Sequence, residues 1–129
     1  MTNPYFFFYG TLQKENLPGF DKVCNGITKG VLVSIDGRYP GLINGSGVVC
    51  GTIYRALSGT PIDTFDRYEG YNPHNLEQSL YRRELRDVCL VNKEDYIWCW
   101  VYLFNQDSTE YTLIKSGNWL IHQHLGQQG

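Results

Sequence analysis

The sequence predicts a mostly β domain of the α+β class with one or two short helices. Three observations support this class. Its 129 residues suffice for one domain with its own core, and we expect residues 1–129 to form that single domain. Many of the 14 glycines fall between segments rich in β-branched and aromatic residues, where they mark turns. One segment, residues 60–70, carries the end signals of a helix instead.

The first predicted strand is the aromatic run from Tyr5 to Tyr9. The run is too short for an isolated helix, Gly10 follows it, and its aromatic residues are typical of a strand. Because apolar side chains then point to both sides, both faces of this strand should contact the core.

Residues 30–35 and 48–55 are the next two predicted strands, because both are rich in β-branched residues. Two turn-rich stretches lie between them, at residues 36–41 and 44–47. Their glycine, proline, asparagine and aspartate content predicts turns in both places.

A short helix is predicted over residues 60–70. Thr60 suits the N-cap, Pro61 suits the first helical position, and Gly70 follows the last turn as a stop. The carboxylate of Asp63 lies in the first turn, where a negative charge stabilises a helix.

A long hairpin is predicted from residues 81–91 and 96–104, with a polar turn at residues 92–95. The second of these strands is nearly all apolar, so we expect burial on both of its sides. The segment from residue 111 to residue 125 spaces its apolar residues in a way that fits either a short helix or irregular cover.

The composition argues against nucleic-acid and membrane partners. Apolar residues make up 42% of the chain and charged residues 19%, which is typical of a folded domain. Eleven Lys and Arg against thirteen Asp and Glu give a formal charge of −2, without the positive surplus of nucleic-acid binders. The apolar run near the start is far too short to span a membrane, so we expect a cytoplasmic protein. The sequence does not indicate the oligomeric state.

The sequence predicts neither a disulfide framework nor a metal site. The four cysteines form no C-x-x-C pair, and three lie in apolar, strand-like surroundings typical of buried thiols: Cys24, Cys50, Cys89 and Cys99. His122 and His124 come closest to a metal pair, but they are isolated, and we interpret them as surface histidines.

Glu69 is the candidate catalytic residue. On a helix it lies within about 40° of both Ile62 and Phe65, so it shares the apolar face. Burial and the negative end of the helix dipole should both raise the pKa of its carboxyl group. A carboxyl group with a pKa near neutral suits a general base that later returns its proton. The alternatives are a structural glutamate hydrogen-bonded to Tyr or Arg, and Asp66 in the catalytic role.

The segment Tyr9-Gly10-Thr11-Leu12 is the candidate substrate-binding loop. Gly10 permits a close backbone approach, and unpaired N–H groups at a strand end can form a concave anion site. An ordinary strand exit explains the same residues. Tyr81 and Arg83 share one face of the predicted hairpin and suit a carboxylate ligand, although a solvated strand face with a packed tyrosine explains them equally well.

Five motifs together resemble the γ-glutamyl cyclotransferase family, and most closely its short branch of γ-glutamylamine cyclotransferase-like and AIG2-like proteins. They occur in the family's order and cover nearly the whole chain: YGTL at 9–12, the YPG turn at 39–41, FDRYEGY at 65–71, Tyr81-Arg82-Arg83, and SGNW at 116–119. The chain departs from the family in two places, with Thr11 where some members have Ser and Asn118 where many have Asp.

The resemblance implies a strongly bent or barrel-like mixed sheet around a cavity that holds a γ-glutamyl group. It implies that Glu69 is catalytic, that Tyr9, Gly10, Thr11 and Leu12 bind substrate, and that Tyr81 is an aromatic residue of the cavity. The implied reaction is attack of the substrate's α-amine on its own γ-carbonyl, which releases 5-oxoproline and an amine, an amino acid or a peptide. It requires no cofactor and no metal.

Two other functions fit the sequence. A binding module of the same fold would sense a γ-glutamyl compound or a related small molecule without catalysis. An interaction protein would instead use exposed members of its 19 aromatic residues as a contact patch.

Overall fold

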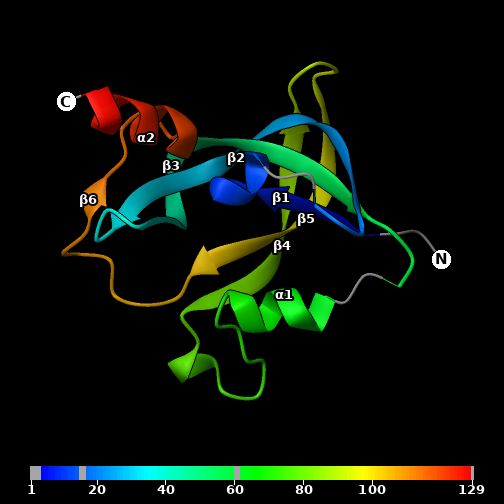
Figure 1. The fold of residues 1–129 in the computed structure, drawn as a ribbon, viewed down its shortest axis with the longest axis horizontal. Coiled ribbons are helices and arrows are strands. Elements are labelled where there is room, and N and C mark those ends of the chain that lie inside the picture. The colour runs from blue at the N-terminus through cyan, green and yellow to red at the C-terminus, as the bar shows by residue number, and fades with distance from the viewer. Residues whose placement is uncertain (1–3, 15–16, 60–61, 129) are drawn as a thin grey trace.

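The computed structural model describes residues 4–14, 17–59 and 62–128, without some of the side chains near the edges of these ranges. Figure 1 shows the arrangement of the helices and strands. In chain order these are β1 (Tyr5–Phe8), η1 (Thr11–Lys14), β2 (Phe20–Ile35), β3 (Tyr39–Ala56), α1 (Ile62–Tyr68), η2 (Leu76–Gln78), β4 (Tyr81–Leu90), β5 (Asp95–Phe104), β6 (Thr112–Leu113) and α2 (Trp119–Gln128).

The strands form one mixed sheet in the order β3-β1-β5-β4-β2-β6, and β3 also pairs with β2. That extra pairing closes the first five strands into a barrel. Two of the strand pairings around the barrel are short. Strand β2 pairs with β4 only at Gly26 and Ile27, and β1 pairs in parallel with β5 at Phe6 and Trp100. The predicted α+β class, with a bent, barrel-like mixed sheet and one or two short helices, is confirmed.

Strands β2 and β3 form a long antiparallel hairpin whose turn spans residues 36–38. Asp36 and Gly37 have φ angles of 55° and 72° there. The turns predicted at residues 39–41 and 44–47 are wrong, because both stretches belong to β3. Residues 44–47 lie opposite Gly30 alone, so their glycines and asparagine form a bulge within a paired strand.

Strand β1 is buried on both faces, as its sequence predicts. Phe7 and, just beyond the strand, Tyr9 join the core cluster that contains Trp119 of α2. Phe6 and Phe8 join a second cluster on the other side, which Ile62 of α1 also contacts. The end of β1 therefore lies between two cores, and its position is rigidly determined by packing.

The hairpin of β4 and β5 is confirmed, with its turn at residues 91–94. The predicted burial of both faces of β5 is wrong for its first half. Tyr96 and Trp98 are 63% and 66% exposed, because this end of the hairpin extends beyond the core. The second half, which runs to Phe104, is buried.

The segment after β5 contains β6 and α2, which settles the choice left open for residues 111–125 in favour of a helix over its second half. The side-chain oxygen of Asn118 accepts a hydrogen bond from the Ile121 amide at 3.2 Å and so caps α2. The predicted N-cap Thr60 and first helical residue Pro61 lie outside the described residues.

All four cysteines lie in strands and are free. Cys99 is buried, and the other three are half-buried. Within the described ranges, no three potential metal ligands come together. No helix there is both long and apolar enough to cross a membrane.

Candidate active site

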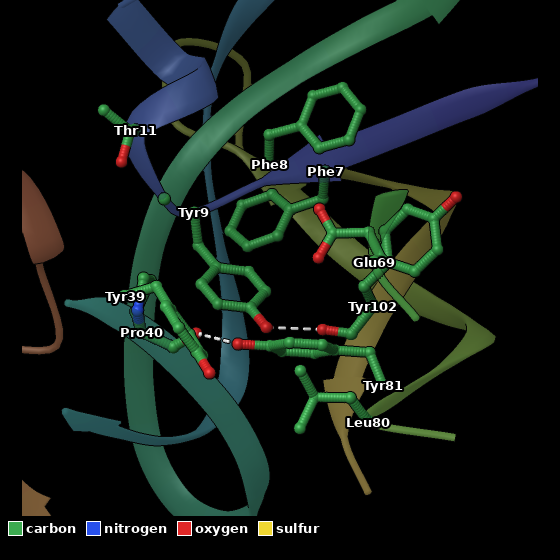
Figure 2. Close-up of a pocket in the computed structure, with 11 residues that line it drawn as sticks. Phe7, Phe8, Tyr9, Thr11, Tyr39, Pro40, Glu69, Leu80, Tyr81 and Tyr102 are labelled. Atoms are coloured by element: carbon green, nitrogen blue, oxygen red, sulfur yellow. Dashed lines mark hydrogen bonds between the residues drawn. The ribbon is translucent and has the colours of Figure 1, made fainter. Parts of the chain in front are cut away.

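A cavity of about 500 Å³ lies at the end of β1, a size typical of small-molecule sites. Figure 2 shows the side chains that surround it. They come from β1 and the loop after it, the start of β3, the turn after α1, the start of β4 and the end of β5. The lining residues are Phe7, Phe8, Tyr9, Gly10, Thr11, Tyr39, Pro40, Glu69, Leu80, Tyr81 and Tyr102.

Glu69 directly follows α1, which ends at Tyr68, rather than belonging to its last turn as predicted. The turn closes with two backbone hydrogen bonds: the Tyr71 amide donates to the Asp66 carbonyl at 2.8 Å, and the Gly70 amide donates to the Arg67 carbonyl at 3.1 Å. Gly70 has a φ angle of 68°, so the pattern is a Schellman motif, which favours glycine at the position after the C-cap residue Glu69. The backbone of Glu69 is held inside this motif.

The Glu69 carboxylate points into the cavity, where Figure 2 draws it between the rings of Phe7 and Tyr102. Burial raises the pKa of this carboxyl group from 4.5 to about 7. The predicted upward shift is confirmed, with burial as its cause. None of the described residues donates a hydrogen bond to the carboxylate. Glu69 is therefore poised to exchange a proton near neutral pH.

Two tyrosines of the cavity use their hydroxyl groups to hold its wall together. Tyr9 donates to the Tyr102 carbonyl and accepts a hydrogen bond from the Leu42 amide at 3.2 Å. Tyr81 donates to the Pro40 carbonyl at 2.7 Å. Burial raises the pKa of both hydroxyl groups, and the negative charge of Glu69 adds to this. Because their protons are already donated, both tyrosines serve as cavity walls rather than as acids.

Asp66, the alternative to Glu69, is occupied by protein partners. Its two carboxylate oxygens accept hydrogen bonds from the Arg83 guanidinium at 2.9 and 3.3 Å. The Tyr102 hydroxyl, which points away from the cavity in Figure 2, donates to the same carboxylate at 2.7 Å. Arg83 thus binds a carboxylate, as its place beside Tyr81 suggested, but the carboxylate belongs to the protein. Asp66 does not line the cavity.

The loop after β1 brings its backbone to the cavity at Gly10 and Thr11. The Gly10 carbonyl accepts two hydrogen bonds from Gln13, from its amide at 3.2 Å and its side chain at 3.1 Å. In a trans peptide the C=O and N–H groups point in opposite directions, so the Thr11 N–H points away from Gln13. Leu12 lies in η1, and its side chain is outside the described part of the structure.

Gly10 packs tightly against β3. A Cβ atom there would lie 3.3 Å from Cγ of Pro40, a contact that only a small shift can relieve. The φ angle of Gly10 is not in the left-handed region, so the glycine provides closeness rather than an unusual backbone angle.

The fold therefore places five predicted site residues around one cavity: Tyr9, Gly10, Thr11, Glu69 and Tyr81. Sequence reasoning missed Tyr102, whose ring lines the cavity while its hydroxyl binds Asp66. It also treated Pro40 as a turn residue. Both lie on strands whose cavity-facing side depends on long-range pairing, and the only local signal was the YPG motif around Pro40.

Comparison with known proteins identifies one family and one fold. The family model described as "Gamma-glutamyl cyclotransferase, AIG2-like" matches residues 6–121. No curated protein matches the chain.

Solved structures share the fold at low sequence identity. YkqA from Bacillus subtilis has a TM-score of 0.73 and 22% identity over 98% of this chain, which spans only 43% of the YkqA chain. An AIG2-like protein from Mus musculus has a TM-score of 0.72 and 22% identity, covering 92% of this chain and 89% of its own. A structure titled "Gamma-glutamyl cyclotransferase" has a TM-score of 0.58 and 15% identity, with 86% of this chain and 69% of its own covered.

Burial of Glu69 predicts a pH-dependent stability. Because its pKa rises from 4.5 to about 7 on folding, the folded state binds more protons than the unfolded state between these pH values. Its contribution to the free energy of unfolding therefore falls as the pH rises from 4.5 through 7. Glu69→Gln removes the ionisable group, so the variant should gain melting temperature relative to the parent at pH 8 more than at pH 5.

Differential scanning calorimetry of both proteins at the two pH values measures this effect. Glu110→Gln, at an exposed position, is the matched control and should show the same difference from the parent at both pH values. A pH-independent difference for Glu69→Gln would contradict the burial of an ionisable carboxyl group.

Proposed function

The chain belongs to the AIG2-like γ-glutamyl cyclotransferase family, and we propose that it is itself a γ-glutamyl cyclotransferase. Its substrate is a γ-glutamyl amine, amino acid or peptide, and its products are 5-oxoproline and the free amine. One observation carries the proposal: Glu69 is the single carboxylate among the described residues that line the cavity. It is half-buried, accepts no hydrogen bond from a described residue, and has a pKa that desolvation raises to about 7.

In the proposed reaction the nucleophile is part of the substrate. The carboxylate of Glu69 accepts a proton from the substrate's α-ammonium group, and the resulting amine attacks the γ-carbonyl carbon. A C–N bond forms and closes the five-membered ring. The proton held by Glu69 then passes to the leaving nitrogen as the original amide C–N bond breaks. The ring nitrogen still carries one proton too many, and Glu69 accepts this proton and gives it to the freed amine, which departs as an ammonium ion and leaves the carboxylate regenerated. Such general acid–base catalysis contributes about 10²–10⁴ in rate.

The cavity suits a zwitterionic γ-glutamyl head group. Its described lining includes no Lys, Arg or His side chain, so backbone N–H groups and the hydroxyls of Thr11 and Tyr39 are the available donors for the substrate's α-carboxylate. We assign this role to the amides of Gly10 and Thr11, at the point where η1 begins. The first N–H groups of a helix have no acceptor within the helix, so they are available to a ligand. The α-ammonium group then lies toward Glu69.

Orientation is the second contribution of the protein. The packed walls around Phe7, Tyr9 and Tyr81 restrict a flexible γ-glutamyl chain to the folded conformer in which its own amine meets its carbonyl. Well-oriented intramolecular reactions gain on the order of 7–11 kcal/mol from such restriction. This explains how a small domain with one acid–base residue is sufficient for the reaction.

The direct test is release of 5-oxoproline, measured by chromatography, from a panel of γ-glutamyl compounds that differ in the leaving amine. We expect release from at least one of them. Failure of every compound, with purified and folded protein, would contradict the proposed activity and favour a binding module.

Glu69→Gln should reduce turnover at least about a hundredfold, because the amide cannot accept or return the proton. The rising limb of the rate near pH 7 should disappear with it. The paired control is Asp66→Asn, which should retain more activity and still show a rising limb at the pH where Glu69 titrates in that variant, since Asp66 is outside the cavity. Comparable turnover in Glu69→Gln and the parent would assign the proton transfer to another group.

Gly10→Val should abolish binding of 5-oxoproline, measured by isothermal titration calorimetry. Its branched side chain would fill the space at the loop and collide with Pro40. The control is Gly45→Ala in β3, whose Cβ would lie 2.4 Å from Cγ2 of Val31; neither residue lines the cavity. That variant should lower the melting temperature and leave affinity unchanged. Full affinity in a folded Gly10→Val protein would remove the loop from the binding site.

A further inference from the structure

Glu69 lies between two residues that both contact one arginine. Asp66, three residues before it, makes the two-point ion pair with Arg83, and Tyr71, two residues after it, has its ring 5.8 Å from the same guanidinium. Arg83 itself stacks at 4.2 Å on the ring of Trp100 in β5. The turn that carries Glu69 is thus tied to the sheet on both of its sides.

Tyr102 extends this connection to the opposite wall of the cavity. Its hydroxyl donates to Asp66 at 2.7 Å, while its backbone carbonyl accepts the hydrogen bond from the Tyr9 hydroxyl. Tyr9 immediately precedes the loop at Gly10 and Thr11. Two hydrogen bonds, joined through Tyr102 itself, therefore link the segment that carries Glu69 with Tyr9 and the proposed carboxylate-binding loop.

We propose that Asp66, Arg83 and Tyr102 form a positioning network that holds the Glu69 carboxylate at a fixed place opposite the loop of residues 9–11. The role rests on the proposed function, since it concerns the same cavity. Asp66 and Arg83 do not line the cavity, so they act through Glu69 and not on the substrate.

The geometry of the network suits this role better than a purely stabilising one. A buried ion pair contributes little net stability compared with apolar residues of similar size, because desolvation offsets its attraction. Its directional two-point contact instead fixes one arrangement of the groups that it joins. Here it joins α1, which has only seven residues, to β4 and β5 at the point where the catalytic side chain projects.

The test removes the ion pair without leaving an unpaired buried charge. The variant is Asp66→Asn with Arg83→Met, and its matched control is Asp21→Asn with Arg55→Met. The control pair is separated by 3.1 Å, close to the 2.9 Å of the first, but its side chains are about half exposed and do not line the cavity. Circular dichroism verifies the fold of both.

Two readouts are needed. In the 5-oxoproline assay, kcat of the Asp66/Arg83 variant should fall about ten- to a hundredfold, as expected for a displaced catalytic group, while KM changes less than about threefold. In ¹³C NMR titration of the Glu69 carboxyl carbon, the pKa should fall from about 7 by at least about one unit toward 4.5, because a released side chain reaches water. The Asp21/Arg55 variant should match the parent in both readouts.

The NMR readout separates this proposal from the proposed function, since it needs no substrate. An unchanged Glu69 pKa in the folded Asp66/Arg83 variant overturns the positioning network, whether or not the parent releases 5-oxoproline. Inactivity of the parent on every compound overturns the proposed function alone. If the double variant fails to fold, Tyr102→Phe decides in its place: it removes one hydroxyl, and it should lower the Glu69 pKa, whereas an unchanged pKa again overturns the network.

Discussion

The pairing of β3 along both of its edges is the constraint on which the site depends. Thr52 and Arg55 each face β1 on one side and β2 on the other, and this double pairing closes the barrel. The bulge at residues 44–47 then lets the first part of β3 continue beyond β1. That extension brings Pro40 against Gly10, so one strand both closes the sheet and supplies a wall of the cavity.

Two tyrosine hydroxyl groups stabilise this arrangement, because they form hydrogen bonds with backbone groups of β3 that would otherwise lack a partner beside the cavity. The Pro40 carbonyl and the Leu42 amide belong to the extension of β3, and they bond to Tyr81 and Tyr9 respectively. Buried backbone groups without partners are costly, so these two tyrosines allow a polar strand edge to border an apolar cavity. Tyr81 donates its hydroxyl proton to the Pro40 carbonyl and Tyr9 donates its own to the Tyr102 carbonyl, so neither proton is free for catalysis and the proposed acid–base role is left to Glu69.

Local patterns were enough to predict most of the elements and the position of Glu69, and long-range contacts explain the rest. The hairpin at residues 81–104 and the buried strand at Tyr5 are visible as alternating or aromatic runs. Residues 44–47 were misread because a bulge opposite Gly30 uses the same residue types as a turn. The network of Asp66 with Arg83 joins residues 17 positions apart, and its geometry exists only once β4 is paired with β5. The cavity itself was predicted only from the five motifs that resemble the family, because local patterns do not show which strands surround it.

Asp66 and Glu69 are only three residues apart, but their carboxylates lie in different environments. Asp66 is buried and has a guanidinium and a hydroxyl as partners, whereas Glu69 is half-buried and has neither. Environments that separate two acids in this way are characteristic of sites where one acid is structural and the other exchanges protons. A cation from the protein beside Glu69 would favour its ionised form and weaken it as a proton carrier. Because the described lining lacks such a cation, the ammonium group of a γ-glutamyl substrate is the charge that would complete the cavity under the proposed function.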